Sequence, residues 1–329
     1  MLVSSWISAA RLPALIILVL NLGCSPGIHT VSTASQAEPW QAGQVIETKS
    51  GRVVSPAELL KELEQYDIIY IGEEHYNRHH VEAAIGVLSG LLADGFSPVL
   101  GMEMFAWDAQ PAVDRYLADP GVGRGAFLEQ AQWKANWGGE FDNYEPLVTL
   151  AQARHLPLRA LNPPKALIRR VVKLGLAQAR DGDDWKRWGL TEEEIVDDPA
   201  YRAKILDQLR RCHGGGAEED YRTMYEASMV RDEGMAKTLA AAVRDTGRNA
   251  VGRRHIVVSY TGGGHIQYNL PVPRRVARRL GGDIRQATVY LTAYDPTRTD
   301  DIRELLKEPI ADYLWLTPTA GSGPVQRCR

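Results

Sequence analysis

Short apolar segments alternate with longer amphipathic ones along most of this chain. Five segments have the length and the β-branched or aromatic content of buried strands: residues 67–71, 98–104, 158–161, 255–260 and 287–291. Between the first two, the apolar residues recur at helical spacing, at Val81, Ile85, Leu88 and Leu92. Strands that alternate with helices predict an α/β fold, in which a mostly parallel sheet is covered by helices on both faces.

Two stretches depart from this alternation. Residues 164–229 are charged and helical in pattern and hold no strand candidate, so we expect an all-helical insertion there. Residues 24–50 are polar and rich in Ser, Thr, Gln, Pro and Gly, which is typical of a flexible tether. We therefore assign the α/β domain to residues 51–318, with a helix that starts near Ser55-Pro56, and a tail to residues 319–329.

The N-terminal residues have the pattern of an export signal. An apolar run over residues 12–22 follows Arg11, and it is too short to span a bilayer comfortably. It ends at Gly23-Cys24, as in a bacterial lipobox, although Asn21 stands where leucine is usual. We expect residues 1–23 to be a lipoprotein signal and Cys24 to carry the lipid that anchors the chain at the outer membrane, facing the periplasm or the surface. An ordinary signal peptide with a coincidental cysteine is the alternative.

Charge and cysteine content narrow the classes of function. The net charge of −3 gives no general attraction to nucleic acid, so we expect no nucleic-acid partner. Three cysteines are too few for a disulfide framework. Cys212 and Cys328 could pair in an oxidising compartment, but their separation in sequence does not define a geometry, and the pairing stays unassigned.

Four ionisable side chains follow the ends of three predicted strands. The first strand runs into Glu73 and His75, the second delivers Glu103, and a later strand runs through three glycines into His265. In parallel sheets, ligands bind beyond the carboxyl ends of the strands, because chain reversals there gather side chains from separate segments. We therefore expect these four residues to converge on one cleft.

Two carboxylates and two imidazoles suit two kinds of chemistry. Glu73, His75 and His265 could ligate a divalent metal through carboxylate oxygen and imidazole nitrogen. Alternatively, a histidine beside a carboxylate could act as a general base on water. The glycine run before His265 lacks the Lys-Ser/Thr ending of a phosphate loop, so nucleotide binding is not expected.

Two charged motifs have no assigned role in that cleft. Four arginines surround the apolar residues of a short predicted helix, at Arg274, Arg275, Arg278 and Arg279. We expect a solvated helix face, with capture of carboxylates or lipid headgroups as the alternative. Asp232-Glu233 belongs to a predicted helix that faces the sheet, and whether one of its carboxylates reaches the cleft stays open.

Taken together, the motifs resemble those of the ChaN-like haem-binding lipoproteins. They extend from about Tyr66 to Arg279, most of the mature chain, so the combination is specific although each motif is short. The motifs are Gly72-Glu73-Glu74-His75 with His79-His80, Met102-Glu103-Met104-Phe105 with Gln110, the stretch 137–146, Ala160-Leu161-Asn162, the stretch 231–236 and Gly264-His265.

The resemblance implies that the protein binds haem through a tyrosine ligand, serves iron or haem acquisition or handling, and dimerises around the cofactor. No motif marks the tyrosine, and three tyrosines of the helical insertion are the candidates: Tyr201, Tyr221 and Tyr225. A haem site requires a broad apolar surface, a tyrosine or histidine ligand, and cationic groups for the propionates.

The wider superfamily includes the Tiki proteases and erythromycin-esterase-like enzymes, and this implies an alternative function. By resemblance to those enzymes, the catalytic residues of a hydrolase, with or without a metal, would be Glu73, His75, Glu103 and His265. The family pattern often has an asparagine where this chain has Gly263, so one polar contact is missing here. We take haem binding as the main interpretation and hydrolysis as the alternative.

Overall fold

The structure is a computed structural model that describes residues 40–245, 252 and 254–320. The predicted signal peptide (1–23), Cys24, Cys328 and residues 321–329 of the predicted tail lie outside this part of the chain. Cys212 is bonded in a disulfide. Of the helices in the described residues, none is long and apolar enough to cross a membrane.

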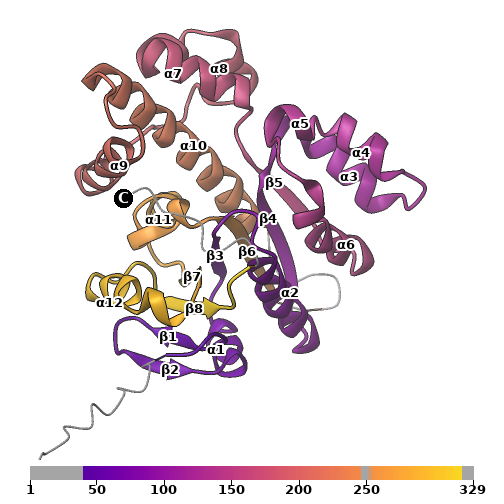
Figure 1. The fold of residues 1–329 in the computed structure, drawn as a ribbon. Coiled ribbons are helices and arrows are strands. Elements are labelled where there is room, and N and C mark those ends of the chain that lie inside the picture. Colours follow the sequence, from indigo (N-terminus) through magenta and orange to yellow (C-terminus); the bar gives the residue numbers. More distant parts are fainter. Residues whose placement is uncertain (1–39, 246–251, 253, 321–329) are drawn as a thin grey trace, which may run out of the picture. The chain divides into compact units, whose positions relative to one another are not determined.

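An eight-stranded sheet organises the fold (Figure 1). In chain order its strands are β1 (Val45–Glu47), β2 (Arg52–Val54), β3 (Ile68–Glu73), β4 (Ser97–Ala106), β5 (Leu158–Asn162), β6 (His255–Gly262), β7 (Gln286–Ala293) and β8 (Tyr313–Thr317). Their order in space is β2-β1-β8-β7-β3-β6-β4-β5. All pairs from β8 to β5 are parallel, and β1 pairs antiparallel with β2 and with β8. The prediction of a mostly parallel α/β sheet is confirmed.

Helices cover both faces of this sheet. In chain order they are α1 (Pro56–Leu63), α2 (Arg78–Ala93), α3 (Gln110–Ala118), α4 (Arg124–Gln130), α5 (Trp133–Asn136), α6 (Glu145–Ala153), α7 (Lys165–Arg180), α8 (Asp183–Arg187), α9 (Pro199–Cys212), α10 (Glu218–Asp245), α11 (Val272–Leu280) and α12 (Thr299–Lys307). As predicted, α1 begins directly after Ser55, whose side chain caps the helix in a reciprocal pair of hydrogen bonds with Glu58.

The central strand β3 shows why helices must cover both faces of the sheet. Successive side chains of a strand point to opposite faces, so an entirely apolar strand exposes two apolar surfaces. Ile69 and Ile71 pack in one core with residues of α1 to α6. Ile68 and Tyr70 pack in the other core, with residues of α10, α11 and α12.

Residues 164–229 contain helices and no strand. A third apolar cluster joins α7, α8 and α9 to the first half of α10, around Trp185, Tyr201 and Tyr225. The second half of α10, including Met235 and Leu239, packs on the sheet instead. Because α10 belongs to both clusters, the predicted boundary at residue 229 falls inside a helix, and α10 ties the helical segment to the sheet.

The predicted tether, residues 24–50, extends too far. Val45–Glu47 forms β1 and pairs with β8, and Val45 and Ile46 are fully buried. The strand is only three residues long, so its own sequence has too few apolar positions to show a pattern. It is stabilised by Tyr313–Thr317, which is more than 260 residues away in sequence. The short strands β1, β2 and β8 were not predicted.

The arginines of α11 do not form a solvated helix face, so that expectation was wrong. Glu233 of α10 is buried and lies within 2.8 Å of Arg278 and 2.5 Å of Arg279, and Arg275 is 3.2 Å away. The helix packs against α10, so three of its cations meet this single buried carboxylate. Arg274 alone is largely exposed, and it pairs with Asp198.

Candidate functional site

The parallel pairing of three strands places the predicted site residues at one edge of the sheet. Glu73 ends β3 and lies opposite Gly262, which ends β6. Glu103 lies on β4 immediately after Met102, which pairs with Tyr260 of β6. The pairing of β4 with β5 becomes irregular after Met102, so the regular ladder ends where Glu103 begins.

Glu73 is almost fully buried and holds His75 in a fixed orientation. Its Oε1 is 2.7 Å from Nδ1 of His75 and accepts a hydrogen bond of 2.8 Å from the hydroxyl of Tyr144. Its Oε2 accepts a 2.7 Å hydrogen bond from the hydroxyl of Tyr260. Since Nδ1 faces a carboxylate, it carries the proton, and Nε2 is the nitrogen left for other partners.

Burial and hydrogen bonding have opposite effects on this pair. Burial raises the pKa of Glu73, and the hydrogen bonds from His75, Tyr260 and Tyr144 offset only part of this rise. Burial lowers the pKa of His75, but the contact with Glu73 and the negative charge of Glu103 outweigh it, so the net pKa is raised. The His75 side chain is still 41% exposed.

Gly262 makes room for the imidazole of His75. A Cβ atom on this residue would lie 2.7 Å from Cε1 and 2.9 Å from Nε2 of His75, closer than side chains normally approach. The N–H of Gly262 donates a 2.6 Å hydrogen bond to Oε2 of Glu103. One glycine thus positions both His75 and Glu103.

The second histidine lies between two carboxylates. Nδ1 of His265, at the end of a short 3-10 helix (Gly263–His265), is 2.5 Å from Oδ1 of Asp232, and its Nε2 is 3.2 Å from Oε1 of Glu103. The other oxygen of Asp232 accepts a 2.5 Å hydrogen bond from the hydroxyl of Tyr201. Asp232 of α10 is therefore the carboxylate that reaches the site, a question that the sequence left open.

His265 is the charged centre of this group. Burial lowers its pKa, but the carboxylates of Glu103 and Asp232 outweigh burial and raise the pKa to about 10. Burial raises the pKa of Glu103, but the charge of His265 outweighs it and holds this pKa well below its usual range. At neutral pH His265 is a cation whose two nitrogens both face carboxylates, so it is poorly suited to act as a base.

We call these five residues, Glu73, His75, Glu103, Asp232 and His265, the Glu/His cluster. The four residues predicted to converge do lie together, and Asp232 joins them. Within the described residues, no group of three or more His, Cys, Asp or Glu side chains could hold a metal ion. Among the proposed metal ligands, both nitrogens of His265 and Nδ1 of His75 face carboxylates, and Glu73 accepts hydrogen bonds from two tyrosines. Metal binding stays a prediction.

The three tyrosines predicted as haem ligands are not gathered at this cluster. All three are buried. Tyr221 donates to the carbonyl oxygen of His213, and Tyr225 donates to Asp197. Tyr201 contacts the cluster, but only from behind Asp232.

Sequence reasoning missed Tyr144 and Tyr260 as partners of Glu73. Tyr260 had a signal, since it is the last residue of the strand predicted at residues 255–260. Tyr144 lies in the stretch 137–146 that resembles the family, but that stretch gives no indication of a contact with Glu73. It follows a short helical turn (Phe141–Asn143) and reaches Glu73 only through the packing of α6 on the sheet.

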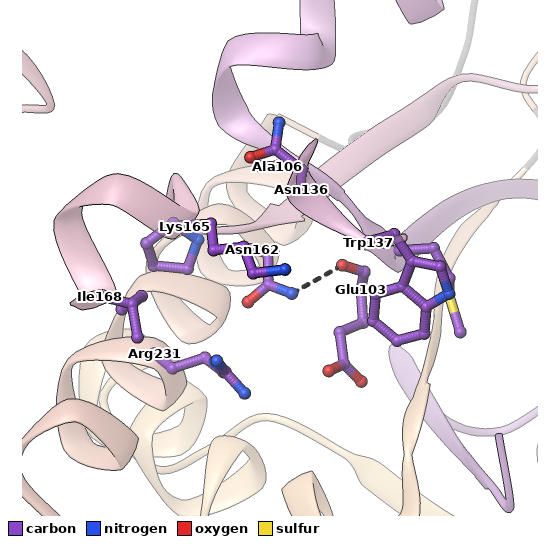
Figure 2. Close-up of a pocket in the computed structure, with 10 residues that line it drawn as sticks. Glu103, Ala106, Asn136, Trp137, Asn162, Lys165, Ile168 and Arg231 are labelled. Carbon is purple, nitrogen blue, oxygen red and sulfur yellow. Dashed lines mark hydrogen bonds between the residues drawn. The ribbon is translucent and has the colours of Figure 1, made fainter. Parts of the chain in front are cut away.

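A pocket of about 190 Å³ opens beside the Glu/His cluster (Figure 2). Glu103, a member of the cluster, and Trp137 both line this pocket. The ring of Trp137 also meets the His75 ring edge-on, with centroids 5.0 Å apart. Figure 2 shows the side chains of Asn162 and Arg231 pointing into the space in front of Glu103. The amide of Asn162 donates a 2.8 Å hydrogen bond to the carbonyl oxygen of Glu103.

Comparison with protein families gives one match. Residues 59–276 match the family described as haem-binding uptake, Tiki superfamily, ChaN. This region contains the whole Glu/His cluster. A comparison with curated protein sequences found no match.

Comparison with solved structures identifies similar folds. ChaN of Campylobacter jejuni, whose structure is described as showing cofacial haem binding, has 15% sequence identity and a TM-score of 0.60, over 84% of this chain and 98% of that one. An erythromycin esterase mutant in its open conformation has 15% identity and a TM-score of 0.41, over 72% of each chain. A protein from Bacillus cereus has 12% identity and a TM-score of 0.39, over 73% of this chain and 71% of that one. At this identity the first likeness shows a shared fold, and the other two are too distant to support an inference.

The raised pKa of His265 has a consequence for stability. In the folded protein the pKa is about 10, against about 6.5 in an unfolded chain. The ion pairs of His265 therefore stabilise the fold fully below about pH 6.5, and this contribution is lost as the pH rises through about 10.

We expect the free energy of unfolding in urea to fall between pH 7 and pH 10 in the wild type by more than it falls in a His265→Gln variant. A His79→Gln variant is the control, because His79 contacts the exposed Glu82 and lies outside the cluster. Equal pH dependence in the wild type and the His265 variant would show that His265 is not held as a cation.

Proposed function

Because the chain belongs to the family described as haem-binding uptake, Tiki superfamily, ChaN, we propose that it binds haem beside the Glu/His cluster and serves haem handling or iron acquisition. The observation that carries this proposal is the family match over residues 59–276. It confirms the resemblance seen in the sequence motifs.

Tyr76 is the described tyrosine best placed to hold haem iron, which tyrosine oxygen ligates in some haem proteins. It is 45% exposed, whereas Tyr201, Tyr221 and Tyr225 are buried. The hydroxyls of those three already donate to protein oxygens. Within the described residues, the Tyr76 hydroxyl has no hydrogen-bond partner.

The surroundings of Tyr76 fit a flat aromatic ligand. Its ring lies beside that of Trp137, with centroids 6.3 Å apart, and beside that of His75, 6.2 Å away. It also lies against Gly139, where a Cβ atom would clash with the Tyr76 ring at 2.3 Å. Its backbone is in the left-handed region, with a φ of 65°, which is uncommon for a residue other than glycine.

A second copy of the chain is proposed to cover the haem. The pocket beside Glu103 has about 190 Å³, less than the roughly 300–1,000 Å³ typical of sites that enclose a small molecule. A porphyrin bound at Tyr76 would therefore remain largely open to solvent on one chain. A homodimer that closes over the exposed Tyr76 and the half-buried Trp137 would bury it.

We expect a Tyr76→Phe variant to lose the shifted Soret band that the wild type gives with one equivalent of haem. The phenol oxygen is the only group removed, so the aromatic surface remains. A Tyr225→Phe variant is the matched control and keeps the band, because its hydroxyl is committed to Asp197. Light scattering of the same samples is expected to show a dimer with haem and a smaller mass without it. A wild type without any Soret shift would overturn the haem proposal.

Hydrolysis is the second candidate function, and the geometry of His75 favours it. Nδ1 of His75 is fixed by Glu73, which Tyr144 and Tyr260 hold in turn. This arrangement of a base oriented by a buried carboxylate is the one that general base catalysis requires. Nε2 has no protein partner among the described residues, and the His75 side chain is 41% exposed, so a water molecule is proposed to bind there.

The proposed reaction is hydrolysis of an ester. Nε2 of His75 accepts a proton from water while the water oxygen forms a bond to the carbonyl carbon. The bond between that carbon and the leaving oxygen then breaks, and the proton passes from His75 to the leaving alcohol. His265, already bonded on both nitrogens, fixes Glu103 and takes no part in the proton transfer.

We expect the wild type to hydrolyse at least one member of a panel of nitrophenyl esters, and His75→Ala to lower kcat by roughly 10²- to 10⁴-fold, the usual contribution of a general base. Glu73→Gln should lower it as well, because the amide cannot hold the protonated Nδ1 in the same way. His255→Ala is the control, since His255 contacts the carbonyl oxygen of Ser97 at the opposite end of β6. Equal activity in wild type and His75→Ala would exclude this role.

Lipid anchoring through Cys24 at the outer membrane is a further part of the proposal. The support is the lipobox-like sequence that ends at Gly23-Cys24. The disulfide bond of Cys212 agrees with export, because disulfides persist in oxidising compartments.

We expect the full-length chain expressed in a bacterium to partition into detergent and to carry a mass increase from acyl groups. A Cys24→Ser variant should lose both properties, because serine cannot form the thioether. A Cys328→Ser variant tests whether the effect is specific to Cys24. Detergent partition of the Cys24→Ser variant at the wild-type level would contradict lipidation at this residue.

A further inference from the structure

Two cations line the pocket beside Glu103 without a carboxylate partner. They are Arg231, on α10 directly before Asp232, and Lys165, the first residue of α7. Among the described residues, neither forms an ion pair. In contrast, the arginines of α11 are paired with Glu233, Glu193 or Asp198.

The lining of the pocket also contains polar atoms that lack a partner. Nε of Arg231 and Oδ1 of Asn162 are buried, and neither has a hydrogen-bond partner within the described residues. Nε of Arg275 and Nε of Arg279 share that property, but their guanidinium groups face the carboxylate of Glu233. Arg231 alone combines a buried donor without a partner and a charge without a counter-charge. An unmade hydrogen bond at a buried donor is costly, so an acceptor is expected in the pocket.

The start of α7 adds to the positive potential. Lys165 begins a helix that runs to a kink at Gly175, with no acidic residue in its first turn and no side-chain cap. The free N–H groups of a helix N-terminus favour anions. Pro163, Lys165 and Ile168 bring this helix end to the wall of the pocket opposite Glu103.

We propose that this pocket is a subsite for an organic carboxylate, with Arg231 and Lys165 as its cationic contacts. Planar guanidinium groups bind carboxylates through two parallel hydrogen bonds. A dianionic phosphate suits the pocket less well, because Glu103 contributes a negative charge to its lining.

The subsite would orient the rest of the bound molecule. Trp137 forms part of the pocket wall and touches the rings of both His75 and Tyr76. A ligand held by its carboxylate in the pocket would therefore extend past Trp137 toward Tyr76 or toward Nε2 of His75. The inference rests on the proposed function in this respect only: the carboxylate belongs to a haem propionate if haem is the ligand, and to an acidic ester if hydrolysis is the activity.

The first experiment probes the subsite without haem. Isothermal titration of the wild type with butyrate and with uncharged butyramide is expected to show binding of butyrate alone. Arg231→Met keeps the unbranched apolar stem of the side chain and removes its charge, and it should weaken butyrate binding at least tenfold. Lys165→Met is the second variant, placed on the first turn of α7 where methionine is tolerated, in case the Arg231 variant does not fold. Arg274→Met is the matched control, because Arg274 is exposed and paired with Asp198.

The second experiment identifies the source of the carboxylate. Haem and its dimethyl ester, which has no free propionate, are titrated into the same variants and followed by the Soret band. A preference of at least tenfold for haem that is lost in Arg231→Met or Lys165→Met supports the subsite and assigns it to a propionate. If butyrate binds but the two porphyrins bind equally well, the subsite is supported and takes another acid. If butyrate binds and no Soret shift appears, the subsite is again supported, and only the haem proposal is refuted. If butyrate does not bind and no porphyrin preference depends on Arg231 or Lys165, the subsite proposal is overturned.

Discussion

The parallel pairing of β3 with β6 is the constraint on which the rest of the site depends. It sets Glu73 opposite Gly262, and the missing side chain of Gly262 leaves the space that the His75 ring occupies. The N–H of the same glycine holds Glu103. A shift of one residue in this pairing would turn Glu73 to the other face of the sheet, away from Tyr144 and Tyr260. The apolar residues of β3 oppose such a shift, because they fill two cores at once.

Charged side chains with partners that offset their charge have a structural role here, whereas charged side chains without such partners are the candidate ligand-binding groups. Glu233 meets three arginines, Glu103 meets His265, and Glu73 meets His75 and two tyrosine hydroxyls. A buried charge without such partners destabilises a fold by several kcal/mol, roughly 3–5 where one partner is removed. Within the described residues, Arg231 and Lys165 have no such partner, although they lie beside this well-compensated cluster. Their charge is therefore available for a bound molecule.

Helix α10 connects these features through three consecutive residues. Successive side chains of a helix are about 100° apart, because one turn takes 3.6 residues. Arg231 therefore faces the pocket, Asp232 contacts His265, and Glu233 points to α11. The two proposed functions share this framework and differ in the atom that they would use, the hydroxyl of Tyr76 for haem binding or Nε2 of His75 for ester hydrolysis.

The sequence by itself determined the α/β class and the cap of α1 at Ser55, because strands and caps depend on neighbouring residues. It also determined the convergence of Glu73, His75, Glu103 and His265, because parallel strands end at one edge of the sheet. Tertiary structure decided the rest. Val45–Glu47 is a strand only because it pairs with Tyr313–Thr317, and Tyr144 and Asp232 reach the site only because α6 and α10 pack on the sheet. The exposure of Tyr76, and the burial of Tyr201, Tyr221 and Tyr225, also follow from contacts between distant segments, which no local pattern records.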